Sequence, residues 1–322
     1  ADTDAMQPAF LAYSSGTTGN PKGILHAHRW IITMGDVIVL STDYGPDDVV
    51  LSPGEFSFMG TFGHGFAAPL YAGAAIGLYY ERPSPQGVLD ALASLRVTKL
   101  FSVPTFFRRV LKEEGAEEGL DLSTMRFATS AGESLGSTVP EMWKQRFDFP
   151  VFEIYGVGEM QVTIANTPFW EVQRGSMGRG LPGIRMTVMD DGLEEVAAGE
   201  QGRLMIHRSD PGFFLGYHKQ RDKWRNAHKG DWYDTGDVVR RDGDGYYHYL
   251  GRKDDLFKSR GYFISPQEIE NVVIKDHRVR EVAVIGVPDE DYGNRICAFV
   301  VTGDGVAPSS GLGEEIIALV RK

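Results

Sequence analysis

The sequence predicts an α/β fold, in which a parallel sheet wrapped by helices is followed by an antiparallel β subdomain and then by a small α+β C-terminal domain. Segments with strand and helix patterns alternate from residue 84 to residue 155, which is typical of a parallel sheet. From about residue 176, short strand-like runs are separated by Gly/Asp turns, which favours antiparallel pairing. We expect one domain over residues 1–250 and a second over residues 251–322, which is incomplete because its last helix is cut off.

Each element carries a local signal. Ser84-Pro85 begins a helix, because serine caps the first turn, proline suits the first helical position and Val88, Leu89 and Leu92 follow at helical spacing. Ser265-Pro-Gln-Glu268 is a capping box. Similar patterns predict helices over residues 26–40, 104–114 and 140–147 and from about 313, and strands over residues 9–13, 100–103, 126–130, 151–155, 184–189, 202–208, 237–241, 246–250, 281–287 and 295–302.

Composition narrows the classes of function. The chain has 322 residues, of which 42% are hydrophobic and 24% charged, and its net charge of −11 disfavours nucleic acid and anionic membrane as partners. No apolar segment reaches the roughly 18 residues of a membrane span. The single cysteine, Cys297, excludes an intrachain disulfide, and its apolar surroundings predict a buried strand thiol in a reducing, cytoplasmic setting. Because the chain begins with Ala1, we expect a fragment or a processed form.

A short loop, Tyr13-Ser-Ser-Gly-Thr-Thr-Gly-Asn-Pro-Lys22-Gly23, is the first candidate site. Its glycines let backbone N–H groups approach an anion, its threonines add hydroxyl donors and Lys22 adds a positive charge, so it can cradle a polyphosphate. It is not a Walker loop, because Pro21 stands where that pattern needs glycine and Gly23 follows the lysine. The residues alone leave open a Gly/Thr-rich surface turn.

Three stretches leave the carboxyl ends of expected strands, where ligands bind on parallel sheets. They are the loop after Tyr13, Ala131-Gly-Glu-Ser134 and Gly156-Val-Gly-Glu159, and we expect them to meet over one site. The stretch from Phe56 to Gly65 mixes aromatic residues with glycines and can shape an apolar pocket, although core packing is the alternative for any single phenylalanine. His64, between two glycines, is a minor candidate.

The order S-S-G-T-T-G-x-P-K-G resembles the phosphate-binding signature of the adenylate-forming superfamily, which includes acyl- and aryl-CoA synthetases, adenylation domains of peptide synthetases and firefly-type luciferases. Four further stretches resemble its signatures in the same order along the chain. They are Ala131-Gly-Glu133, Tyr155-Gly-Val-Gly-Glu159, Tyr233-Asp-Thr-Gly-Asp237, and Gly251 through Lys258, Gly261 and Pro266 to Glu270. Matches spanning residues 13 to 270 in one order make chance negligible.

The resemblance implies a role for each matching residue. The implied catalytic residues are Lys22, Thr18 and Glu159, of which Glu159 also binds Mg²⁺. Phosphate binding is implied for Ser15, Gly16, Thr17 and Gly19, nucleotide binding for Gly132, Glu133 and Tyr155, and ribose or phosphate binding for Asp237 and Arg252. Gly261 is implied to lie where the pantetheine chain passes, and Asp254 is implied to be the hinge between the domains. A carboxylate suits vicinal ribose hydroxyls, and a hard oxygen suits Mg²⁺. The alternatives are an Asp237 that caps its own turn, an Arg252 paired with Asp254 or Asp255, and a salt-bridged Glu159.

The implied reaction uses ATP, Mg²⁺ and CoA, and converts a small carboxylic acid to an acyl-CoA through an acyl-adenylate. By analogy the acyl pocket is formed by Phe58, Phe62, Gly63, Tyr155 and Val157, and the run around it is most similar to aryl-CoA ligases of the benzoate type. We therefore expect an aromatic or medium-length apolar acid, no nucleic acid and no membrane span, and leave a homodimer open.

Two departures from the superfamily pattern keep other functions open. Gly158 replaces a threonine, and no stretch matches the superfamily's region ahead of the loop or its later P-x-x-x-x-G-K segment, so we expect a truncated or partly ordered chain or a split enzyme. The alternatives to a CoA ligase are an enzyme that loads a carrier-protein phosphopantetheine and a catalytically weak nucleotide-binding regulator.

Overall fold

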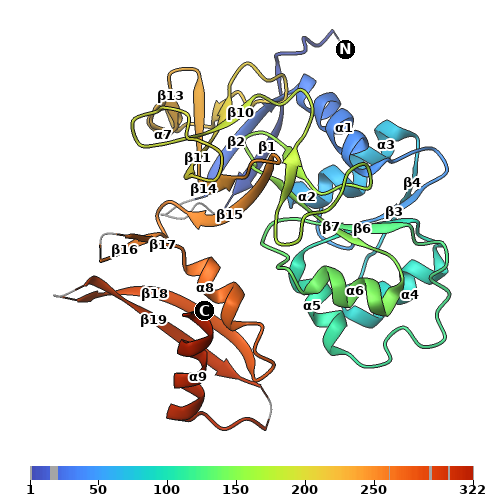
Figure 1. Cartoon of the computed structure of the whole chain (residues 1–322). Helices are drawn as coiled ribbons and strands as arrows, with labels where there is room; N and C mark the ends of the chain where they lie inside the picture. The colour runs from blue at the N-terminus through green and yellow to red at the C-terminus, as the bar shows by residue number, and fades with distance from the viewer. Residues whose placement is uncertain (1, 15–20, 261, 290–291, 304, 322) are drawn as a thin grey trace. The chain divides into compact units, whose positions relative to one another are not determined.

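The computed structural model describes residues 2–14, 21–260, 262–289, 292–303 and 305–321 (Figure 1). The chain forms two compact units. The first comprises Ala1–Thr187, Met205–Thr235 and Asp242–His248, and the second comprises Val188–Leu204, Gly236–Arg241 and Tyr249–Lys322. The mixed α/β fold predicted from the sequence is confirmed, whereas the division at residues 250/251 stays a prediction.

A parallel sheet forms the centre of the first unit. Its strands follow the order β4-β3-β5-β6-β7. Their bounds are β3 (Val49–Leu51), β4 (Ala75–Gly77), β5 (Lys99–Ser102), β6 (Phe127–Ser130) and β7 (Val151–Gly156). Figure 1 shows helices on both faces of these strands: α1 (His28–Thr42), α2 (Met59–Phe62), the π-helical turn η1 (Gly63–Ala67) and α3 (Ala68–Ala72) on one, and α4 (Pro85–Ser94), α5 (Pro104–Lys112) and α6 (Val139–Phe147) on the other.

The two faces of this sheet bury separate clusters because successive strand side chains point to opposite sides. Leu51 and Leu100 pack with α4, α5 and α6, whereas their neighbours Val50 and Phe101 pack with α1. The predicted cap of α4 is confirmed, since Ser84 Oγ accepts a hydrogen bond of 3.2 Å from the Gly87 N–H. The alternation therefore places α1 on the face opposite α4, α5 and α6.

Antiparallel strands complete the first unit. The bounds of the strands and of one helix are β1 (Pro8–Ser14), β2 (Lys22–Ala27), β8 (Val162–Ala165), β9 (Gly178–Gly180), β12 (Gly216–Tyr217), α7 (Arg221–Ala227) and β13 (His228–Lys229). The helix expected from residue 26 begins at His28 instead, because residues 22–27 pair with β1 as a hairpin and β12 adds on the other edge of β2. The two registers fix Tyr217 opposite Ile24, and Ser14 opposite Lys22.

The remaining strands and helices include the C-terminal α+β module. The strands β10 (Met186–Met189), β11 (Gln201–His207), β14 (Trp232–Arg241) and β15 (Tyr246–Arg252) follow the order β10-β11-β14-β15, and the module consists of β16 (Phe257–Ser259), β17 (Tyr262–Ile264), α8 (Pro266–Val273), β18 (Val279–Asp289), β19 (Gly293–Thr302) and α9 (Ser310–Val320). Ser265 Oγ caps α8 by accepting a hydrogen bond of 3.2 Å from the Glu268 N–H, as predicted. Cys297 lies on β19 but is half-buried rather than fully buried.

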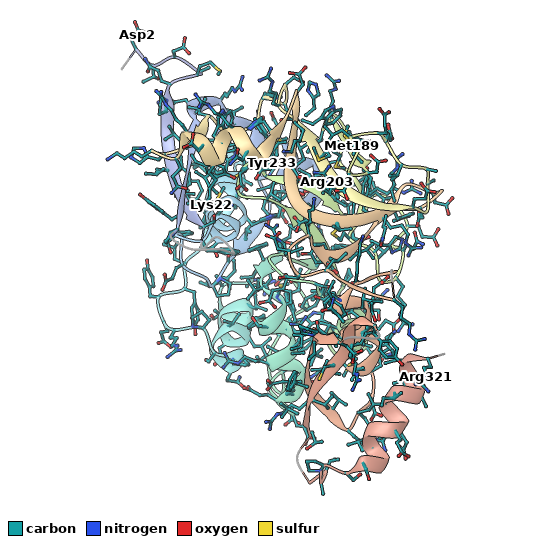
Figure 2. The ribbon with its side chains drawn as sticks, turned by 90° about the vertical axis from the view of Figure 1, so that its left-hand side faces the viewer. Asp2, Lys22, Met189, Arg203, Tyr233 and Arg321 are labelled. Atoms are coloured by element: carbon teal, nitrogen blue, oxygen red, sulfur yellow. The ribbon has the colours of Figure 1, made fainter. Side chains whose placement is uncertain are left out.

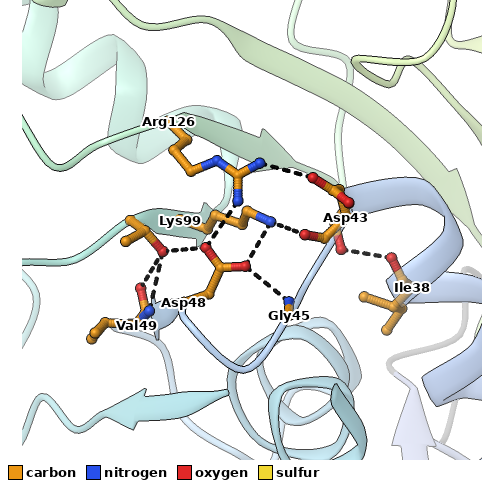
Figure 3. A network of polar contacts seen from close by, with 9 residues as sticks. Ile38, Asp43, Gly45, Asp48, Val49, Lys99 and Arg126 are labelled. Carbon is orange, nitrogen blue, oxygen red and sulfur yellow. Dashed lines mark hydrogen bonds and ion pairs between the residues drawn. The ribbon is translucent and has the colours of Figure 1, made fainter. Parts of the chain in front are cut away.

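A buried ion pair connects the amino-terminal ends of three parallel strands (Figure 3). Lys99, the first residue of β5, is 1% exposed and its Nζ lies 2.8 Å from the Asp48 carboxylate, which also accepts a hydrogen bond from Arg126 at 3.2 Å. Arg126 lies just before β6 and pairs with Asp43 at 2.8 Å. Burial opposes ionisation of Asp48, but hydrogen bonds from Lys99 and Thr98 outweigh it and lower its pKa. The pair is therefore ionised, and either partner alone would be a buried charge.

Within the described ranges, no helix has the length and apolar character needed to cross a lipid bilayer.

Candidate active site

The loop between β7 and β8 carries Glu159, whose carboxylate is held by two side chains from the neighbouring small sheet. Glu159 is 6% exposed, and it accepts a hydrogen bond of 2.5 Å from the Tyr217 hydroxyl and one of 3.3 Å from Lys22 Nζ. Lys22 begins β2 and Tyr217 ends β12, so the pairing of these strands presents both groups to the carboxylate. The structure thus brings together Lys22 and Glu159, which the sequence placed 137 residues apart.

A second tyrosine extends this cluster, which we call the Glu159 cluster and which consists of Lys22, Glu159, Tyr217 and Tyr233. The Tyr217 and Tyr233 hydroxyl oxygens lie 3.1 Å apart, and the ammonium of Lys22 lies 5.3 Å from the centre of the Tyr217 ring. Lys22 and Tyr233 are labelled in Figure 2. Burial, followed by the negative charge of Glu159, raises the pKa of Tyr233 well above its usual value. The Tyr233 hydroxyl therefore remains protonated at neutral pH.

Two side chains from β2 and α1 clamp the backbone on either side of Glu159. His26 Nε2 donates a hydrogen bond of 2.8 Å to the Gly158 carbonyl, and Trp30 Nε1 donates one of 2.5 Å to the Met160 carbonyl. The carbonyl of Glu159 itself accepts a hydrogen bond of 3.0 Å from the Phe214 N–H. Three consecutive carbonyls are thus fixed, which orients the carboxylate between them.

The same two side chains stack on each other, with ring centroids 4.0 Å apart. His26 is fully buried, and burial lowers its pKa to about 4 although the Gly158 carbonyl and the Glu159 charge both oppose this shift. The imidazole is therefore neutral at physiological pH, and it acts on the loop as a hydrogen-bond donor rather than as a charge.

A cavity of about 360 Å³ adjoins the Glu159 loop. The lining residues come from the end of β1, α1, the segment of α2 and η1 with the residues just before it, β5, the segment after β6, and the Glu159 loop with the adjoining ends of β7 and β8. They are Tyr13, Ser14, Trp30, Met34, Ile38, Ser57, Phe58, Met59, Gly60, Gly63, His64, Phe101, Ala131, Gly132, Gly156, Val157, Gly158, Gln161 and Val162. Phe58, Gly63 and Val157, expected in the acyl pocket, are among them. Phe62 is not one of the described lining residues and instead stacks on Phe10 at 4.8 Å.

The segment after β6 supplies the remaining first-unit residues that the sequence singled out. Gly132 lines the cavity, whereas Glu133 is exposed and pairs with Arg108 at 3.3 Å. Tyr155 lies in β7 and is half-buried. The carboxyl ends of β6 and β7 therefore meet at this cavity, as expected for adjacent parallel strands.

Gly158, at the position where the superfamily pattern has threonine, is closely surrounded. A Cβ added there would lie 2.8 Å from Ile24 Cδ1 and 3.4 Å from Met59 Sδ, and Ile24 is fully buried. The departure from the pattern is therefore matched by a bulky neighbour that occupies the space of the missing side chain.

In the second unit, Asp237 and Arg252 form an ion pair of 2.8 Å. Asp237 is 3% exposed, and its carboxylate also accepts a hydrogen bond of 3.2 Å from the Tyr249 hydroxyl. The strand expected over residues 237–241 begins earlier, at Trp232, so Asp237 lies within β14, where Gly236 adopts φ +78°. This left-handed residue, which favours glycine, interrupts the extended backbone beside the carboxylate. Arg252 thus pairs with Asp237, rather than with Asp254 or Asp255 as the alternative supposed.

The other residues predicted from the sequence fall at or beyond the limits of what the structure describes. Asp254 is exposed in the segment after β15. Ser15, Gly16, Thr17, Thr18, Gly19 and Gly261 lie outside the described residues. Their predicted roles, like those of Lys22, Glu159, Asp237 and Arg252, stay predictions.

The described residues contain no group of three or more His, Cys, Asp or Glu side chains arranged to hold a metal ion. Mg²⁺ on a nucleotide needs less, because phosphates and water supply most of its ligands and one or two carboxylates suffice. Glu159, a buried hard-oxygen donor with neighbouring hydroxyls, fits that requirement.

Sequence reasoning missed Tyr217, Tyr233, His26 and Trp30 as members of the site. Tyr217, His26 and Trp30 carry no local signal, because each reaches the Glu159 loop through a strand pairing or helix packing that joins distant segments. The Tyr-x-Thr-Gly-Asp match did include Tyr233, but it drew attention to the aspartate only.

The fold and the cavity define a class: an α/β protein with a cavity at the carboxyl ends of its parallel strands. Comparison with known families specifies this further. The family model of the AMP-binding enzymes matches residues 1–218, and the model of the AMP-binding enzyme C-terminal domain matches residues 268–322. The chain therefore belongs to the AMP-binding enzyme family, which confirms the resemblance to the adenylate-forming superfamily.

Similar proteins include CoA ligases that act on aromatic acids. The chain is 36% identical to a 4-hydroxybenzoate–CoA/benzoate–CoA ligase of Rhodopseudomonas palustris over 302 residues, covering 94% of this chain and 56% of the relative. It is 33% identical to a benzoate–CoA ligase of Thauera aromatica, covering 100% of this chain and 61% of the relative. The chain thus spans less than two thirds of the length of these relatives.

Solved structures show the same likeness. An anthranilate CoA ligase in complex with anthranoyl-AMP superposes with a TM-score of 0.90 and 30% identity, covering 99% of this chain and 61% of that one. A benzoate CoA ligase from Burkholderia xenovorans superposes with a TM-score of 0.88 and 31% identity, covering 100% and 63%.

Proposed function

We propose that the protein is an ATP-dependent carboxylic acid–CoA ligase that acts through an acyl-adenylate and releases pyrophosphate. The observation that carries the proposal is the Glu159 cluster, which sets a lysine and a buried carboxylate beside an apolar cavity. In the first step a substrate carboxylate oxygen bonds to the α-phosphorus of ATP, and the bond from that phosphorus to the bridging oxygen breaks. Pyrophosphate leaves with the electron pair.

The protein's task in this step is positioning and charge stabilisation, because the reacting groups come from the substrates. Lys22 is suited to neutralise negative charge on the phosphate oxygens. Glu159 would hold the Mg²⁺ that accompanies the nucleotide, and that ion would supply further charge neutralisation. Tyr217, together with the carbonyl clamp formed by His26 and Trp30, keeps the Glu159 carboxylate in one orientation. Lys22 would meanwhile change its partner from this carboxylate to phosphate.

In the second step a thiol sulfur attacks the acyl carbon, AMP leaves and the thiol proton passes to solvent. We propose CoA as the thiol, on the printed activities of the relatives. Asp237 is proposed to accept hydrogen bonds from the ribose hydroxyls, with Arg252 beside it, and Asp254 to serve as the hinge. The acid is proposed to be aromatic or medium-length and apolar, on the lining of the cavity. Homodimer formation and a cytoplasmic location stay predictions.

The test is acid-dependent exchange of labelled pyrophosphate into ATP by the complete polypeptide over a panel of carboxylic acids. Exchange with at least one acid, followed by thioester formation when CoA is added, supports the proposal. If exchange occurs but the acyl group is transferred only to a carrier-protein phosphopantetheine, the acceptor is that carrier protein rather than CoA. Nucleotide binding without exchange for any acid would instead favour a regulator, the alternative to which Gly158 points.

A further inference from the structure

His64 is a buried histidine without a hydrogen-bonding partner. It is 2% exposed, and neither ring nitrogen has a partner among the described residues. A neutral imidazole offers one N–H donor and one acceptor, and buried polar groups of this kind are nearly always paired in folded proteins. Two ring nitrogens without partners, on a residue of the cavity wall, therefore point to a ligand in the cavity that can form a hydrogen bond with the ring.

The ring is held firmly in that wall. It stacks on Phe101 with ring centroids 4.3 Å apart and planes inclined by 3°, and the Tyr44 ring lies nearly perpendicular to it with centroids 6.5 Å apart. His64 lies in the π-helical turn η1, an irregularity that is often found at functional sites. Because stacking rather than hydrogen bonding holds the ring, neither nitrogen is committed to a described protein partner.

The position of His64 along the cavity follows from α1. Trp30, Met34 and Ile38 line the cavity at intervals of four residues, so the lined length of the helix is about 12 Å at 1.5 Å per residue. Trp30 marks the end beside the Glu159 loop, where its indole bonds to the Met160 carbonyl. Gly63, next to His64, lies against the other two residues, because a Cβ there would be 3.1 Å from Met34 Sδ and 3.2 Å from Ile38 Cδ1. His64 is thus remote from the Glu159 cluster.

The chemistry of the ring narrows what it recognises. Burial alone lowers the pKa of His64 to about 3, so the ring is neutral at physiological pH and does not attract a second carboxylate by charge. A neutral group that both donates and accepts, such as a hydroxyl or a primary amine on an aromatic ring, matches it. The other described residues of this end of the cavity, Met34, Ile38 and Phe101, are apolar.

We propose that His64 determines specificity by hydrogen bonding to a neutral polar substituent, a hydroxyl or an arylamine, at the end of the acid substrate opposite its carboxylate. The inference rests on the proposed acid–CoA ligase function, which places the carboxylate at the Glu159 end. The substrate class is accordingly an acid with an apolar body and a polar far end, rather than a purely hydrocarbon acid.

The experiment compares acids in matched pairs that differ only in a terminal hydroxyl: benzoate and 4-hydroxybenzoate, 3-phenylpropanoate and its 4-hydroxy analogue, and hexanoate and 6-hydroxyhexanoate. The kcat/KM of pyrophosphate exchange is measured for the wild type, His64→Phe, His64→Leu and His64→Gln. Phe66→Leu, on the same turn but 40% exposed, is the matched control. His64→Phe keeps the stacking on Phe101, and His64→Leu serves if that variant does not fold.

We expect the wild type to favour the hydroxylated member of at least one pair by about tenfold or more, because a site built to bond a hydroxyl leaves its own polar atoms unpaired with the other member. His64→Phe should lose or reverse that preference, His64→Gln should keep part of it and Phe66→Leu all of it. No preference in the wild type for any pair, or an unchanged preference in His64→Phe and His64→Leu, overturns the proposal.

Failure of the proposed function gives a different result. If no acid supports exchange, calorimetric titration of the same acid pairs into the same variants decides on His64 alone. A hydroxyl-dependent affinity that disappears in His64→Phe supports the site without the activity. Equal affinities within every pair, or no binding of any acid, overturn it.

Discussion

Replacing His26 with leucine tests the carbonyl clamp around Glu159. The substitution removes the donor that bonds to the Gly158 carbonyl at 2.8 Å, along with the stacking on Trp30 at 4.0 Å. An unsatisfied, partly buried carbonyl costs about 1–3 kcal/mol, and an aromatic pair contributes about 0.5–1.5 kcal/mol. Part of this loss should appear as misorientation of the Glu159 loop in the transition state. If that part raises the activation barrier by about 1.4–2.8 kcal/mol, the rate falls by a factor of about 10–100.

The assay is pyrophosphate exchange at varied MgATP, with the free energy of unfolding measured in urea. We expect His26→Leu to lower kcat/KM for MgATP by about 10- to 100-fold, largely through kcat, because the orientation of Glu159 matters most when charge develops on the phosphates. His26→Gln, whose amide can still donate, should recover part of the loss. His28→Leu, two residues away and exposed, should match the wild type. The proposed orienting role of His26 would be refuted if folded His26→Leu protein had a kcat/KM for MgATP within twofold of the wild type. It would also be refuted if His26→Leu and His26→Gln had the same kcat/KM.

The same variant carries a pH signature. Because the pKa of His26 falls to about 4 in the folded protein from 6.5, the unfolded chain binds more protons between these values. The contribution of a neutral, buried His26 to stability is therefore present above pH 6.5 and is lost as the pH falls towards 4. His26→Leu should show a smaller loss of unfolding free energy between pH 7 and pH 5 than the wild type, by urea titration at both values.

Three further substitutions test separate parts of the structure. Asp237→Ala should weaken MgATP binding by about tenfold or more, through loss of the proposed ribose contact, without changing secondary structure; calorimetry that gives wild-type affinity would refute the ribose assignment. Lys99→Met should lower the free energy of unfolding by about 3–5 kcal/mol, because it removes the buried partner of Asp48 and leaves that carboxylate with only the half-exposed Arg126. Asp48→Asn combined with Lys99→Met should regain part of this loss, and a loss below about 1 kcal/mol for Lys99→Met in urea would contradict the reasoning. Gly158→Thr should lower the free energy of unfolding by about 1–3 kcal/mol through overpacking against Ile24. Adding Ile24→Val, which removes the crowding Cδ1, should restore part of this stability. Equal stabilities of Gly158→Thr and the double variant would show that the loop shifts to make room for the threonine.

Features written in short stretches of sequence were predicted correctly. The caps at Ser84 and Ser265 are local, since the side chain and the N–H that it accepts from are three residues apart. The alternating strands and helices between residues 84 and 156 follow from apolar spacing alone. The Lys22 and Glu159 motifs were found because their residue types carry chemistry, although nothing local said that they touch.

Features set by distant pairing were not predictable. Residues 26 and 27 were expected to begin a helix, but they end β2, to which β1 and β12 supply hydrogen-bonding partners on its two edges. The strand expected from Asp237 begins instead at Trp232, because Trp232 and Tyr233 pair with β13. Tyr217 entered the site only through its pairing with β2. Which of these segments meet is decided by tertiary packing, which overrides local propensity.

The ionic network of Figure 3 lies at the amino-terminal ends of the parallel strands, and the cavity adjoins their carboxyl ends. The two are joined through Tyr44, whose ring centre lies 5.3 Å from Lys99 Nζ and 6.5 Å from that of His64, and through Phe101, which lines the cavity two residues after Lys99. Substitutions at sites that share packing partners have coupled rather than additive effects on stability. A redesigned acid pocket should therefore be selected together with residues of the ionic network, because substrate range and thermal tolerance are linked traits in this fold.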